Sequence, residues 1–161
     1  MGALVVLRGF SDFGDSAGAG TSAWKVSEVT FASADIDRTW LEKGAWGSLV
    51  LKHRCKRFTN YHSHNDQVLD VSEKIQNGGR ERAGRDGMPE LVAPGHFDVE
   101  CSAQYLKDVK PSKQKQVYSH RWWFDNAGYF KDLNAVINGA DADTMPTRRA
   151  RAGTSDQELF T

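Results

Sequence analysis

The sequence lacks several features that would each point to a class of protein. It has no excess charge, because 21 lysines and arginines balance 21 aspartates and glutamates, so neither nucleic acid nor an anionic membrane is expected as a partner. No apolar run approaches the roughly 18 residues that a membrane span needs. The first ten residues also lack the basic start and the small-residue cleavage site of a secretory signal. The residues as given therefore favour a cytoplasmic protein.

Cysteine is scarce too. Cys55 and Cys101 are the two cysteines of the sequence, and neither lies in a Cys-x-x-Cys pair, so no disulfide framework is expected and both are predicted to be buried thiols. Gly18-Ala19-Gly20 is no phosphate loop, because no strand leads into it and no lysine follows. The sequence predicts no cofactor. Its 161 residues suit one domain, since domains usually have about 100 to 200 residues.

The most informative stretch runs from Asn60 to Leu69. An apolar and aromatic run, Phe58 to Tyr61, gives way to polar residues and then to the helical spacing of Val68, Leu69, Val71 and Ile75. A strand followed directly by a helix is half of a βαβ unit, and loops at the carboxyl ends of parallel strands carry the chemistry. Asp66 is therefore placed as a working carboxylate. The same residue also fits the N-cap of a helix that starts near Gln67.

The rest of the chain predicts an α/β domain over residues 1–143. We expect three consecutive parallel strands with helices on both faces. The strands are predicted near 26–34, 58–63 and 97–102, and helices over 1–10, 39–54, from 67 onward and 126–138. Residues 144–161 contain three arginines and few apolar residues, which predicts a disordered tail.

Four motifs carry a resemblance to a known family. They are Ala34-Asp35-Ile36-Asp37-Arg38, Ser63-His64-Asn65-Asp66-Gln67-Val68-Leu69, Arg82-Ala83-Gly84 and Ser119-His120-Arg121-Trp122-Trp123. In this order the chain resembles the carboxyl-terminal half of an α/β-hydrolase fold, and more narrowly the bacterial α/β-hydrolase family of unknown function. The resemblance covers about residues 1–140. It implies a partial α/β-hydrolase fold, with about three parallel strands flanked by helices, and esterase- or lipase-like hydrolysis of a small ester or acyl substrate.

The resemblance also implies roles for single residues. A serine hydrolase needs an imidazole to take the proton of the serine and a carboxylate to hold that imidazole. Asp66 and His120 would be these acid and histidine residues, and Asp35 is the reserve acid because it also follows a strand. Trp122 and Trp123 are expected either to pack in the core and its rim or to form an apolar wall for an acyl chain.

The nucleophile itself is expected upstream. Met1-Gly2 followed by a helix resembles the end of a Gly-x-Ser-x-Gly elbow, so the serine would precede Met1 and the Met1 nitrogen would stand at the position of an oxyanion donor. On this interpretation the first strands and any signal are missing and the 161 residues are inactive alone. Strand 26–34 would then be a bare edge, able to pair with a second copy of the chain.

Two alternatives remain open. His62-x-His64-x-Asp66 copies the ligand spacing of metallo-β-lactamase-like binuclear hydrolases, although those enzymes place a further histidine where Gln67 stands. A catalytically silent structural or interaction module is the other alternative. A chelator would inactivate a metalloenzyme, and a fluorophosphonate would inactivate a serine hydrolase. A silent module would show no hydrolase activity for either reagent to inhibit.

Overall fold

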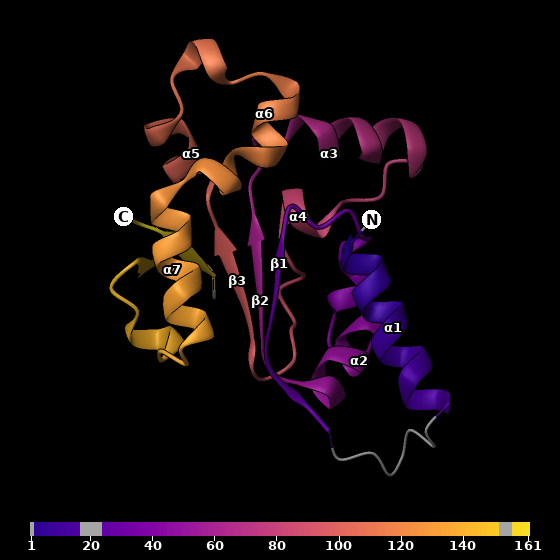
Figure 1. Ribbon diagram of the computed structural model, residues 1–161. Coiled ribbons are helices and arrows are strands. Elements are labelled where there is room, and N and C mark those ends of the chain that lie inside the picture. Colours follow the sequence, from indigo (N-terminus) through magenta and orange to yellow (C-terminus); the bar gives the residue numbers. More distant parts are fainter. Residues whose placement is uncertain (1, 17–23, 152–155) are drawn as a thin grey trace.

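The computed structural model describes residues 2–16, 24–151 and 156–161, and it packs helices against one mixed sheet (Figure 1). The sheet has the strand order β1-β2-β3-β5-β4. The strands are β1 Val26–Ala32, β2 Cys55–His62, β3 His96–Glu100, β4 Arg148–Ala150 and β5 Gln157–Leu159. β1, β2, β3 and β5 run parallel to one another, and β4 is antiparallel to β5. The three predicted parallel strands are confirmed.

Helices cover both faces of the sheet (Figure 1). The α-helices are α1 Gly2–Ser16, α2 Trp46–Arg54, α3 Gln67–Val71, α4 Ala83–Asp86, α5 Ser102–Asp108, α6 Gln116–Arg121 and α7 Ala127–Ile137. The 3-10 helices are η1 Arg38–Leu41, η3 Pro111–Lys113, η4 Trp122–Asp125 and η5 Ala142–Thr144, and η2 Ser72–Gln76 is a π-helix. None of the helices in these described ranges is long and apolar enough to cross a membrane.

The helix predicted over 39–54 is broken in the structure. The 3-10 turn η1 and the helix α2 are separated by Gly44, whose φ of 91° lies outside the right-handed helical region. Gly47 then lies so close to η1 that a Cβ there would be 2.9 Å from the Trp40 carbonyl oxygen. The two glycines thus turn the chain and let α2 pack tightly against the turn before it.

Two hydrophobic cores lie on opposite faces of the sheet. Leu7 of α1 and Leu51 of α2 pack on the face that carries Phe31 and Phe58, whose rings meet edge to face at 5.1 Å. The other face carries Tyr61, Val99 and Leu159 and packs against Trp122, Trp123 and Tyr129. Side chains alternate along a strand, so the odd spacing between Phe58 and Tyr61 sends them to opposite cores. The sheet is therefore covered on both faces.

Polar residues occupy one face of β2 and β3 near the end where the strands finish. His96, Asp98 and Glu100 alternate along β3 with apolar residues, and all three are buried. The parallel register sets Asp98 beside Asn60 and Glu100 beside His62. The amide of Asn60 donates to Asp98 at 2.8 Å. This polar strip thus brings two buried carboxylates, those of Asp98 and Glu100, to one face of the sheet.

The segment predicted as a disordered tail is partly ordered in the sheet. Within the described residues of 144–161, β5 pairs with β3 and Leu159 is 1% exposed in the core. The side chain of Arg148 is also buried, and its guanidinium donates to Asp132 at 2.7 Å. A charged residue enters the interior at acceptable cost when a carboxylate compensates it, and the sequence alone does not reveal that pairing. Residues 152–155 lie outside the described ranges.

The Arg82-Ala83-Gly84 motif ties the ends of two strands together. Ala83 N–H donates to the Ile36 carbonyl at 3.0 Å and Gly84 N–H donates to the Ala34 carbonyl at 2.9 Å, beyond β1. The Gly84 carbonyl accepts from Ser63 N–H, beyond β2, at 3.0 Å. A Cβ on Gly84 would lie 2.1 Å from the Ala34 nitrogen. The motif therefore needs glycine, and it fixes the two loops that carry Asp35 and Asp66.

Candidate active site

Asp66 lies in the loop after β2 and uses its two carboxylate oxygens for two purposes. Oδ1 accepts from the backbone N–H groups of Val68 and Leu69 at 3.1 and 3.0 Å, which caps α3. Oδ2 lies 2.9 Å from Nδ1 of His120. The carboxylate is fully buried. The helix cap and the contact with histidine, which the sequence left as alternatives, are therefore both present in one side chain.

His120 is carried by α6, which packs against α3. The two helices are joined next to the histidine, because Gln67 N–H donates to Ser119 Oγ at 3.0 Å. The carboxylate of Asp66 can only accept, so Nδ1 of His120 carries the proton and Nε2 is left as the acceptor. The hydrogen bond to Asp66, with the charge of that residue, raises the pKa of His120 although partial burial opposes the rise. Its side chain is 38% exposed.

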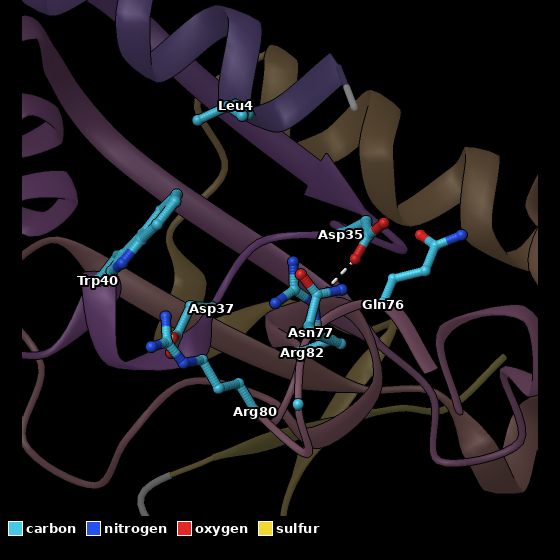
Figure 2. Close-up of a pocket in the computed structure, with 9 residues that line it drawn as sticks. Leu4, Asp35, Asp37, Trp40, Gln76, Asn77, Arg80 and Arg82 are labelled. Atoms are coloured by element: carbon cyan, nitrogen blue, oxygen red, sulfur yellow. Dashed lines mark hydrogen bonds and ion pairs between the residues drawn. The ribbon is translucent and has the colours of Figure 1, made fainter. Parts of the chain in front are cut away.

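Asp35, the reserve acid, has a different partner. Its Oδ1 accepts from Nε of Arg82 at 2.8 Å, and both oxygens lie within 3.1 Å of Ser72 Oγ. Figure 2 shows the contact with Arg82 directly. Among the described residues, His120 has its hydrogen bond with Asp66 and none with Asp35. The structure therefore brings together Asp66 and His120, and it joins Asp35 to a guanidinium.

A cavity of about 450 Å³ opens beside Asp35 (Figure 2). Leu4 of α1 and Trp40 of η1 supply apolar surface, while the charged groups come from the loops after β1 and η2. Those charged lining residues are Asp35, Asp37, Arg80 and Arg82. The cavity thus combines a small apolar wall with charges of both signs.

Trp122 and Trp123 pack in the core, which corrects the expectation of an apolar substrate wall. They are 1% and 2% exposed, and their rings lie 4.6 Å apart. Trp123 Nε1 donates to Ser33 Oγ at 2.7 Å. Ser33 has a φ of 50°, an uncommon backbone conformation for a residue with a side chain. Both indoles lie in the same core as Tyr129 of α7, and the Trp123 indole braces the turn that leads to Asp35.

The histidines before Asp66 meet a different carboxylate from the one that the spacing suggested. One ligand atom from each of His62, His64 and Glu100 lies within 4.8 Å of the others. Asp66 is outside this group because its oxygens face α3 and His120. Partial burial and the neighbouring His62 lower the pKa of His64. The set His62, His64 and Asp66 is therefore not assembled.

The remaining titratable candidates are structural. His96 is buried, its ring meets Phe58 at 5.3 Å, and burial lowers its pKa to about 4. Cys55 and Cys101 are buried free thiols, and burial raises the pKa of Cys55 to about 11. Met1, the expected oxyanion position, lies outside the described residues.

Sequence reasoning missed the partners that surround the predicted residues. Arg82 stood in a recognised motif, but nothing in the sequence says that its guanidinium would meet Asp35. Ser119 stood beside His120 without a role, and it joins α6 to α3. Glu100 had a usable signal, because it ends a strand that alternates polar and apolar residues next to the strand that ends in His62.

A family model described as alpha/beta hydrolase of unknown function matches residues 1–87. The matched region contains β1, β2 and Asp66, and it stops before β3 and His120. No curated protein and no solved structure matches the chain. The match therefore covers more than half of the 161 residues and one member of the pair at the candidate site.

Proposed function

The chain belongs to the family of alpha/beta hydrolases of unknown function, and on that premise we propose that Asp66 and His120 are the acid and the base of a serine hydrolase. The observation that carries this proposal is the 2.9 Å contact between His120 Nδ1 and Asp66 Oδ2. The reaction is esterase- or lipase-like hydrolysis of a small ester or acyl substrate. No cofactor takes part in it.

Each group has a defined step. Asp66 holds the Nδ1–H tautomer, so Nε2 of His120 takes the proton of a serine hydroxyl as the oxygen attacks the ester carbonyl. The imidazolium then gives this proton to the departing alkoxide, which leaves as an alcohol, while the acyl group stays bonded to the serine oxygen as an acyl-enzyme. Water is activated in the same way and releases the acid and the free serine. The raised pKa of His120 fits its role as the base.

We place the nucleophilic serine outside the described residues, at the position that would precede Met1. Within those residues no hydroxyl is hydrogen-bonded to His120. α1 begins near the end of the sheet at which β1 and β2 finish (Figure 1), so a serine leading into this helix would reach the same edge as Asp66. On this proposal the 161 residues alone have no hydrolase activity. The catalytically silent module is the second candidate function, and the observation that favours it is that, within the described residues, His120 has no hydroxyl partner to activate.

The cavity beside Asp35 is the proposed binding place for the substrate. Its mixed charges, from Asp37 and Arg80 among others, suit an ester that also carries polar groups, and Trp40 offers a flat apolar surface. A long acyl chain fits this lining poorly. Short, polar esters are therefore the proposed substrate class.

A fluorophosphonate probe tests the proposal. We expect the probe not to label the 161 residues. When the chain is extended by the residues that its natural upstream codons encode, we expect both labelling and hydrolysis of a short ester. His120→Ala should abolish hydrolysis in the extended chain, whereas His53→Ala, an exposed histidine on α2, should not. A stop codon or a non-nucleophilic residue directly before Met1 removes the proposal. Hydrolysis that resists the probe but stops with a chelator favours a metalloenzyme.

We further propose that the edge of β1 pairs with another strand. β1 has β2 as its one neighbour in the described sheet, and an open edge presents unpaired N–H and C=O groups. Upstream strands of the same chain or a second copy would satisfy them. Light scattering should therefore show dimers or larger species for the 161 residues and monomers for the extended chain.

A further inference from the structure

We propose that His62, His64 and Glu100 form a binding site for a divalent transition-metal ion, with zinc preferred. His62 ends β2, Glu100 ends β3, and the parallel register sets these two side by side. His64 follows in the loop after β2. One ligand atom from each of the three lies within 4.8 Å of the others. This site is separate from the Asp66–His120 pair and independent of the proposed hydrolase activity.

His62 is the observation that points to a ligand. Its residue is 1% exposed, and neither ring nitrogen has a hydrogen-bond partner. The nearest carboxylate oxygen, Oδ2 of Asp98, is 3.5 Å from Nε2. A buried imidazole with both nitrogens unmet is unfavourable, because buried polar groups normally find partners. A metal ion bound to one nitrogen would remove part of this cost.

The charge around His62 also favours a cation. Asp98 and Glu100 are 7% and 6% exposed, and among the described residues no lysine or arginine forms an ion pair with either. Met88 N–H donates to Asp98 and Ser102 N–H donates to Glu100 Oε1. These backbone donors hold the carboxylates in place without neutralising them. Oε2 of Glu100 remains available to a metal.

The ligand set selects the metal. Two imidazoles and one carboxylate are a common set for zinc, which binds them at about 2.0 to 2.2 Å and often leaves a fourth position for water. In a tetrahedral site these ligand atoms would be about 3.4 Å apart, so atoms that lie within 4.8 Å must draw together by at most about 1.4 Å. His64 is the member that can move without disturbing the core, because its side chain is 47% exposed. His62 and Glu100 form the fixed, buried half.

The test measures metal binding by the 161 residues without a histidine tag. Equilibrium dialysis should find one zinc ion per chain. Co²⁺, added in place of zinc, should give the visible absorption bands of a four-coordinate site. Zinc at about 100 times its dissociation constant should raise the melting temperature by about 5 to 11 °C. Absence of zinc uptake, or uptake without the Co²⁺ bands, overturns the proposal.

His64→Ala is the decisive variant, because a half-exposed side chain can be removed without opening the core. It should weaken zinc binding by more than about 100-fold, since even the outer partners of ligands are worth about 10- to 100-fold. Glu100→Gln should weaken binding as well. His53→Ala and His120→Ala should bind as the wild type does. Unchanged binding in His64→Ala, or loss of binding in His120→Ala, overturns the proposal, and neither result bears on the hydrolase assignment.

Discussion

Asp35 and Asp66 stand at equivalent places in two neighbouring strand-to-loop transitions, and yet they have opposite kinds of partner. Asp35 follows β1 and meets the guanidinium of Arg82 at 2.8 Å, whereas Asp66 follows β2 and meets the imidazole of His120 at 2.9 Å. A guanidinium keeps its proton at every physiological pH, while an imidazole exchanges its proton near neutrality. The partner, and not the carboxylate or its position, therefore decides which loop is suited to proton transfer.

The two loops also differ in how their partners arrive. Arg82 belongs to the Arg82-Ala83-Gly84 motif, whose backbone is hydrogen-bonded to the chain beyond β1. His120 comes from a separate helix, α6, which packs against the helix that Asp66 caps. The side chain of Asp35 is 31% exposed and that of Asp66 is 0% exposed. We infer that the first loop holds the strand ends together and lines the proposed substrate cavity, whereas the second loop carries the group for proton transfer.

The largest expected effect is on catalysis. In a preparation with fluorophosphonate-sensitive esterase activity, Asp66→Asn should lower kcat by about 10⁴-fold because the wrong tautomer of His120 is then favoured. Asp35→Asn should lower kcat by less than about tenfold, because Asp35 does not contact the imidazole. Steady-state kinetics measure both. If the two substitutions cost the same, the contrast between the loops is wrong.

For stability we expect the reverse order, with a larger effect from replacing Asp35 than from replacing Asp66. Asp35→Ala leaves Arg82, which is 6% exposed, without its carboxylate, and we expect a loss of about 2 kcal/mol in the free energy of unfolding, less than a fully buried pair would cost. Urea denaturation measures this loss. Replacing Arg82 by Met in the same chain should recover part of it, since no unpaired charge then remains. A double variant less stable than Asp35→Ala would contradict this account.

A smaller effect on stability should distinguish the roles of the two carboxylate oxygens of Asp66. Asp66→Ala removes the cap of α3 and should cost about 1 kcal/mol, whereas Asp66→Asn keeps an oxygen that can accept from Val68 and Leu69 and should cost a few tenths of that. The same urea curves measure both variants. Equal losses would mean that the bond to His120, and not the cap, carries the stability.

The smallest effect is on the titration of His120. Its pKa is raised in the folded chain, so the stability that it contributes is fully present below its unfolded pKa of about 6.5 and is lost as the pH rises through the folded value. The contribution should stay below about 1 kcal/mol because the ring is 38% exposed. NMR titration should show a lower pKa in Asp66→Asn and a much smaller change in Asp35→Asn. Equal shifts would place Asp35 beside the ring.

The sequence predicts well those features that depend on runs and order. Three apolar runs became parallel strands, and Asp66 directly follows one of them, so its place at the carboxyl edge of the sheet could be predicted. His120 reaches Asp66 on α6, and only the order of the motifs, not a strand pattern, indicated that contact. The pairing of Asp35 with Arg82 depends on where the long segment between η2 and β3 folds back, and no periodic pattern records that path. β5 has three residues, two of them polar, so it gives no strand signal of its own.

The pairing of β5 with β3 has a consequence during protein synthesis. Val99 pairs with Gln157, about 60 residues later in the chain, and ribosomes add about 5 to 20 residues per second. The free side of β3 therefore stays open for about 3 to 12 s after β3 has been made. In that interval the nascent chain presents an unprotected strand to chaperones or to neighbouring chains. Slower translation would lengthen this exposure, so the yield of folded protein should fall as elongation slows.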